Sequence, residues 1–119
     1  MKNNLVADKS IEFSIRIIKV YKTLIENRKE FILSKQMLRS GTSIGALIRE
    51  AEHAQSKADF LNKMNIALKE ANETDYWFLL LYKGEYLNQQ EYDSLEIDIK
   101  ELIKLLVKIV KTTKESLGR

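Results

Sequence analysis

The chain has 119 residues, with 20 basic and 17 acidic side chains, 45% hydrophobic residues, four glycines, and neither proline nor cysteine. This length fits one domain over residues 1–119. The absence of cysteine excludes disulfide scaffolds, thiol catalysis and cysteine-ligated metal centres. Because proline is absent and glycine is scarce, the turns of a sheet protein are missing, and the composition predicts a few long helices.

No targeting segment stands out in the sequence. The first residues lack the apolar run of a signal peptide. The longest uncharged aromatic and aliphatic run covers residues 76–82, whereas a membrane span needs about 20 residues. We therefore expect a soluble, cytoplasmic protein with no membrane partner.

Hydrophobic periodicity predicts four helices, at about residues 8–28, 35–54, 57–82 and 89–114. Their candidate N-caps are, in chain order, Asp8 or Ser10, Ser34, Ser56 and Asn88. Gly84 is the expected stop of the third helix. Because the connections are short, consecutive helices should be antiparallel neighbours, which gives an all-α, up-down-up-down four-helix bundle.

The predicted helices carry more apolar surface than a single bundle needs. On a helical wheel, the apolar arc covers roughly 220° of the first helix and roughly 200° of the last, against about 100° for a core-facing stripe. The end of the third helix is apolar nearly all round, and its aromatic residues are expected to be core or interface anchors: Tyr76, Trp77, Phe78 and Tyr82. This excess predicts a homo-oligomer.

A stretch of small and hydroxylated residues interrupts the second helix: Arg39, Ser40, Gly41, Thr42, Ser43, Ile44, Gly45 and Ala46. A phosphate-binding loop is one interpretation, but the P-loop spacing is absent and no lysine follows Gly45. The other is a helix whose glycines, four residues apart, let a neighbouring helix pack closely. The apolar periodicity on either side of the stretch favours close packing.

A second motif covers residues 66–71 (Ile-Ala-Leu-Lys-Glu-Ala) and closes with Thr74, Tyr76 and Trp77. With residues 39–46, it makes the chain resemble the four-helix-bundle family described as 23S rRNA intervening-sequence proteins. The resemblance extends over most of the chain. One departure is Leu47, where the family commonly has asparagine.

The resemblance implies a left-turning bundle that assembles into a ring-like homopentamer. Relatives are encoded within inserts in ribosomal RNA genes. A related branch serves as accessory proteins of retroelements, where it binds a reverse transcriptase and nucleic acid. No enzymatic activity is implied.

Basic side chains form two candidate nucleic-acid-binding surfaces. The last predicted helix has a stripe at i, i+4, i+8 and i+11, formed by Lys100, Lys104, Lys108 and Lys111. The first predicted helix has a smaller cluster, formed by Arg16, Lys19 and Lys22. In a ring, either surface would become a continuous positive track that attracts RNA or DNA without sequence specificity. Nearby carboxylates and a net charge of only +3 also allow a merely solvated face. A protein-interaction scaffold without a nucleic-acid role is a further alternative.

His53 is the only histidine, so any imidazole chemistry would depend on it. Arg49 precedes it with three residues between, whereas helical ribonucleases of the HEPN type place four to six there. We expect no catalytic residue, no cofactor and no metal, because His53 with nearby carboxylates is a common pattern on charged helices. Carboxylates in the third helix (Glu70, Glu73 and Asp75) are expected to pair with Arg39, Lys63 or Lys69.

Overall fold

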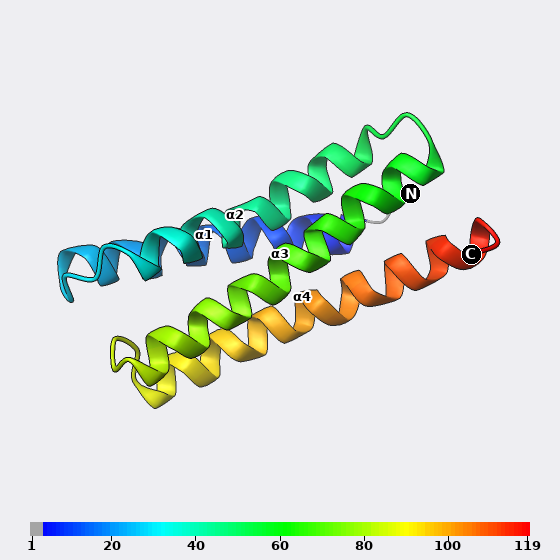
Figure 1. Cartoon of the computed structure of the whole chain (residues 1–119). Helices are drawn as coiled ribbons and strands as arrows, with labels where there is room; N and C mark the ends of the chain where they lie inside the picture. Colours follow the sequence, from blue (N-terminus) through cyan, green and yellow to red (C-terminus); the bar gives the residue numbers. More distant parts are fainter. Residues whose placement is uncertain (1–3) are drawn as a thin grey trace.

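The computed structural model describes residues 4–119 as four antiparallel helices in a bundle of 47 × 21 × 21 Å. The helices are α1 (Asn4–Glu26), α2 (Leu33–Glu52), α3 (Lys57–Lys83) and α4 (Gln89–Ser116). They run side by side, and the start of α1 and the end of α4 lie at the same end of the bundle (Figure 1). The predicted all-α up-down-up-down bundle is confirmed.

The core forms where the apolar stripes of the four helices meet. Each helix packs against the next one in chain order, and α4 also packs against α1. The largest fully buried side chains come from all four helices: Ile17, Leu24, Met37, Ile44, Ile48, Thr74, Phe78, Leu81, Leu95, Ile99, Leu102 and Leu106. Burial of this continuous apolar interior is the main force that holds the helices together.

The seam between α1 and α4 is the least closely packed of the four. Two ion pairs cross it, Lys9–Glu101 and Arg16–Asp98, and a third, Arg28–Glu91, joins the loop after α1 to α4. Two cavities of about 230 and 160 Å³ lie along this seam. Polar side chains therefore bridge α1 and α4 where apolar packing is thinnest.

The predicted N-caps of the first two helices are wrong. α1 begins at Asn4 and ends at Glu26, so Asp8 and Ser10 lie inside it, and the Ser10 hydroxyl donates to the Ala7 carbonyl at 2.7 Å. α2 begins at Leu33 and not at 35. The buried Ser34 hydroxyl donates to the Glu30 carbonyl, also at 2.7 Å.

Glu30 caps α2 in place of Ser34. Its carboxylate accepts hydrogen bonds from the backbone N–H groups of residues 32, 33 and 34, at 3.2, 3.0 and 2.6 Å. Burial of Glu30 raises the pKa of its carboxyl, but these N–H donors outweigh burial and the net pKa is lowered. A carboxylate that lies before the helix thus binds the free N–H groups of its first turn.

The remaining predicted ends are confirmed, within one or two residues. Ser56 Oγ accepts from Asp59 N–H at 3.0 Å, and Asn88 forms a reciprocal capping box with Glu91. α3 stops at Gly84, although Gly84 does not take the left-handed conformation. Glu85 takes it instead, with φ of 70°.

Candidate functional site

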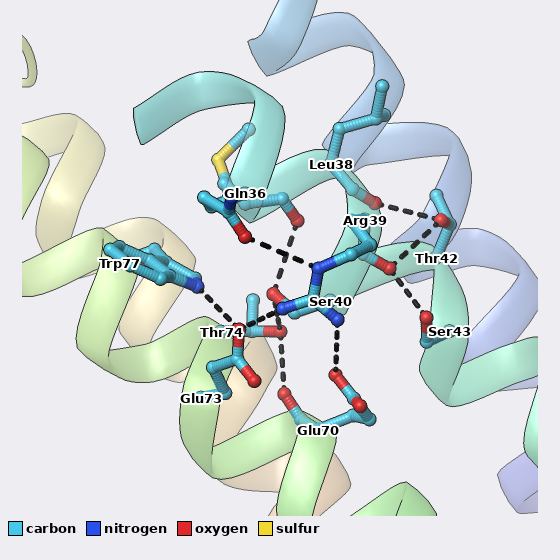
Figure 2. A network of polar contacts seen from close by, with 11 residues as sticks. Gln36, Leu38, Arg39, Ser40, Thr42, Ser43, Glu70, Glu73, Thr74 and Trp77 are labelled. Carbon is cyan, nitrogen blue, oxygen red and sulfur yellow. Dashed lines mark hydrogen bonds and ion pairs between the residues drawn. The ribbon is translucent and has the colours of Figure 1, made fainter. Parts of the chain in front are cut away.

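The two sequence motifs meet between α2 and α3. Arg39, on α2, contacts two carboxylates of α3: Nη1 donates to Glu70 Oε1 at 3.2 Å, and Nη2 pairs with Glu73 Oε2. Its Nε donates to Gln36 Oε1 at 3.3 Å. The guanidinium therefore has acceptors on both helices (Figure 2). The predicted pairing of Arg39 with these carboxylates is confirmed, at a half-exposed site.

Two further polar contacts complete this network. Thr74 Oγ1 donates to Ser40 Oγ at 2.8 Å, and both residues are fully buried. Trp77 Nε1 donates to Glu73 Oε2 at 2.9 Å, so Glu73 joins the indole to Arg39 (Figure 2). Buried polar groups that satisfy one another fix one arrangement of the packed helices. The motifs thus set how α2 and α3 align.

The two glycines of the 39–46 motif lie against α1. A Cβ atom on Gly41 would lie 3.0 Å from Ile17 Cγ1, and one on Gly45 would lie 3.3 Å from Ser10 Oγ. The Thr42 and Ser43 hydroxyls donate to carbonyls one turn back, at 2.8 and 2.7 Å. Ile44 is fully buried, and Ala46 is exposed. The whole motif is helical, so the close-packing interpretation is confirmed and the phosphate-loop alternative is wrong.

The predicted basic surfaces divide into paired and unpaired cations. Arg16 contacts Asp98 and donates to Ser94 Oγ at 2.7 Å, which fixes it between α1 and α4. Lys100 Nζ lies 3.4 Å from Asp75 Oδ2 and 3.7 Å from Glu96 Oε1. These two cations are therefore largely neutralised by carboxylates. Two other predicted residues of α1 are exposed on its surface: Lys19 and Lys22.

The C-terminal part of the chain, from the second half of α4 to Arg119, gathers exposed cations with no acidic partner among residues 4–119. Among residues 4–119, no carboxylate lies within 4.0 Å of their side-chain nitrogens. The five members of this group, which we call the α4 basic segment, are Lys104, Lys108, Lys111, Lys114 and Arg119. The last two were missed from the sequence: Lys114 continues the stripe at i+3 from Lys111, whereas Arg119 follows the end of α4 at Ser116.

The α4 basic segment borders a surface groove of about 360 Å³. The apolar part of the groove comes from Leu68 on α3 and from two residues of α4, Val107 and Val110. Three members of the segment and one carboxylate complete it: Lys111, Lys114, Arg119 and Glu115. The first half of α4 is acidic by contrast, with Glu91, Asp93, Glu96, Asp98 and Glu101. Positive charge is thus concentrated on one half of the helix.

His53 lies at the C-terminal end of α2, where it is exposed and its backbone N–H donates to the Glu50 carbonyl at 3.1 Å. The Glu50 carboxylate pairs with Lys63 Nζ at 3.2 Å. Within residues 4–119, no group of three or more histidine, aspartate or glutamate side chains is arranged to hold a metal ion.

The predicted aromatic anchors occupy different environments. Phe78 is fully buried, with its ring 6.3 Å from that of Phe13. Trp77 is partly buried, and Tyr82 stacks on Tyr92 with the ring centroids 4.5 Å apart. Tyr76 is 52% exposed. Only Phe78 is therefore a core residue in the full sense.

α1 also carries an exposed apolar stripe. Ile11, Ile15 and Ile18, spaced i, i+4 and i+7, are exposed by 51, 49 and 41%. Helical geometry places all three on one face, so they form a continuous strip along the helix. This strip is the outer part of the wide apolar arc that the sequence predicted.

A family model described as 23S rRNA-intervening sequence protein matches residues 2–108, most of the chain. The chain belongs to this family. It is similar to a protein with unknown function from the S23 ribosomal protein family of Bacteroides thetaiotaomicron VPI-5482, whose crystal structure was determined at 1.70 Å resolution. The two chains are 60% identical, with a TM-score of 0.91, over 93% of this chain and 99% of that chain.

The resemblance seen in the two motifs is therefore confirmed. A comparison with curated proteins gave no match. No helix within residues 4–119 is both long and apolar enough to cross a membrane.

Proposed function

We propose that this family member is a non-enzymatic homo-oligomer that binds RNA or DNA without sequence specificity through the α4 basic segment. The α4 basic segment carries this proposal, because its five exposed cations have no carboxylate partner within residues 4–119. Free cations on one helix half can replace the counterions of a phosphate backbone, and their release favours binding.

The chemistry of this surface favours backbone contacts over base readout. Exposed aromatic residues are Phe31, Tyr76 and Tyr86, and all of them lie outside the α4 basic segment and its groove. Stacking on bases needs an aromatic platform. Lysines and one arginine alone can contact phosphates in any sequence, which supports sequence-independent binding.

Self-association is the second part of the proposal. The apolar strip Ile11, Ile15 and Ile18 supports it, since such surfaces on soluble proteins commonly mark contact sites. The family resemblance implies that the assembly is a pentamer. Five copies would repeat the α4 basic segment around a ring and raise the avidity for a long polyanion.

The binding surface can be tested by charge reversal. The variant Lys104→Glu/Lys108→Glu/Lys111→Glu is compared with a matched control, Lys29→Glu/Lys35→Glu/Lys83→Glu, which changes the charge equally at exposed sites outside the segment. Affinity is measured by fluorescence anisotropy with labelled duplex DNA and structured RNA at low salt. The first variant should lose most of the binding, and the control should keep more of it.

Two results would contradict the proposed surface. One is equal loss in the two variants, which would mean that net charge alone matters. The other is a wild-type protein that binds neither nucleic acid at low salt. A wild-type protein that is free of nucleic acid but co-elutes with another polypeptide would favour the protein-interaction scaffold, including a reverse-transcriptase accessory role.

A further inference from the structure

The middle of the α3–α4 seam holds two carboxylates and one cation. Asp75 comes from α3, and Glu96 and Lys100 come from successive turns of α4. Lys100 Nζ bridges them, at 3.4 Å from Asp75 Oδ2 and 3.7 Å from Glu96 Oε1. One lysine thus faces two potential negative charges.

The second oxygen of Glu96 has no partner among the described residues. Glu96 Oε2 is buried and accepts no hydrogen bond, and the side chain as a whole is only 18% exposed. A buried carboxylate oxygen without a donor is costly, because it has lost its water. A protonated Oε2 has no such cost when it can donate to a neighbouring carboxylate.

Asp75 is that neighbour. Burial raises the pKa of Glu96 to about 7, and hydrogen bonding and charge from Asp75 act in the same direction while Lys100 opposes them. Tyr92, one turn earlier on α4, also lies near this group, since the charge of Glu96 contributes to raising the pKa of Tyr92. Asp98 faces the other side of α4, toward Arg16 of α1.

We propose that Asp75 and Glu96 share one proton across the α3–α4 seam, so that the pairing of these two helices responds to pH near neutrality. With the proton bound, Glu96 Oε2–H donates to the Asp75 carboxylate, and Lys100 balances the single remaining charge. Without it, two like charges adjoin and Oε2 is left unpaired. The seam is therefore tighter in the protonated state.

The sign of the effect follows from linkage. In the unfolded chain the pKa of Glu96 is near its ordinary value of 4.5, whereas the folded chain holds the proton up to about pH 7. The folded state therefore binds more protons in this window, and stability falls as the pH rises through it. With these two pKa values, the folding equilibrium constant should fall by about 30-fold between pH 5.5 and 8.

Unfolding by urea at a series of pH values, at one fixed protein concentration, tests this inference without any nucleic acid. The wild type should lose stability from pH 5.5 to 8. Glu96→Gln, whose amide can donate to Asp75 at every pH, should lose this slope and be more stable than the wild type at pH 8. Glu115→Gln, at an exposed site on the same helix, is the control and should keep the wild-type slope.

Carboxyl ¹³C chemical shifts of the wild type give a second test that needs no variant. Glu96 should titrate near pH 7, and its midpoint should fall in Asp75→Asn, which removes the neighbouring charge. A Glu96 midpoint near 4.5 in the wild type, or the same stability slope in the wild type and Glu96→Gln, would overturn the inference.

Discussion

At the scale of single residues, the two glycines of α2 show how closely α1 approaches it. A methyl group on Gly41 would lie 3.0–3.3 Å from three carbons of Ile17, which is fully buried. One on Gly45 would meet the Ser10 and Ser14 hydroxyl oxygens at 3.3 and 3.4 Å. A buried isoleucine has little freedom to move, whereas a serine side chain is small and rotates more easily.

We therefore expect alanine to be tolerated better at Gly45 than at Gly41. Alanine at Gly41 should lower the free energy of unfolding by about 1–3 kcal/mol through overpacking. At Gly45 the contacts are milder, and the gain in helix propensity of about 1 kcal/mol should offset most of their cost. Urea unfolding of Gly41→Ala and Gly45→Ala measures both, and equal stability of the two variants would contradict the close approach at Gly41.

Residues with local partners were predictable, and those with distant partners were not. Ser56 and Asn88 bond to N–H groups three residues ahead, so the sequence pattern contains the whole interaction. Glu30 could not be recognised as a cap, because the loop must fold back before its carboxylate reaches the N–H groups of α2. Likewise, the sequence alone indicates that Arg16 and Lys100 are free cations, because their carboxylate partners come largely from other helices.

Among the helices, α1 and α4 pack less closely than the other neighbours, and charged contacts bridge them. Arg28, in the loop after α1, makes a two-pronged contact, as Nη1 and Nη2 donate to the two Glu91 oxygens at 2.8 and 2.6 Å. Glu91 also accepts the Asn88 N–H at 2.9 Å and so caps α4. The hydrogen bonds from Arg28, above all, lower the pKa of Glu91.

Glu91→Gln should therefore lower the free energy of unfolding by about 1–2 kcal/mol at pH 7, since a charge-assisted bond and a cap contact both weaken. A lowered pKa means that this contribution is present above the unfolded value of about 4.5 and is lost as the pH falls below it. Urea unfolding should show a smaller deficit at pH 3 than at pH 7. An equal deficit at both pH values would contradict the ionic contact.

The same change at the more exposed Glu101 should matter less. Glu101→Gln should lower the free energy of unfolding by less than about 0.5 kcal/mol.

The order and direction of the helices were predictable, because the apolar periodicity and short connections require antiparallel neighbours. The looser packing between α1 and α4, compared with the other neighbouring helices, was not predictable. It depends on side chains that meet only in the folded bundle, such as Lys9 with Glu101. The candidate site shows the same division: the lysine spacing of α4 was visible in the sequence, but which lysines stay unpaired depends on α3.

At the scale of the whole molecule, the strip of Ile11, Ile15 and Ile18 predicts self-association. Ile15 is 49% exposed, so Ile15→Lys should disturb the core little while placing a charge in the proposed contact. Size-exclusion chromatography with light scattering at micromolar concentration should show an oligomer for the wild type and smaller species for the variant. Val107→Lys, at a 47% exposed position of α4, should keep the wild-type mass. A wild-type monomer would contradict the prediction.

If the unpaired cations of the α4 basic segment bind phosphates, the affinity for nucleic acid must depend on salt in proportion to the number of contacts. Each lysine that contacts duplex DNA adds about 0.9 to the steepness of log K against log salt. The slope of Lys104→Glu/Lys108→Glu/Lys111→Glu should therefore be shallower than that of the wild type by about 2–3 per protomer engaged. An unchanged slope would contradict the account.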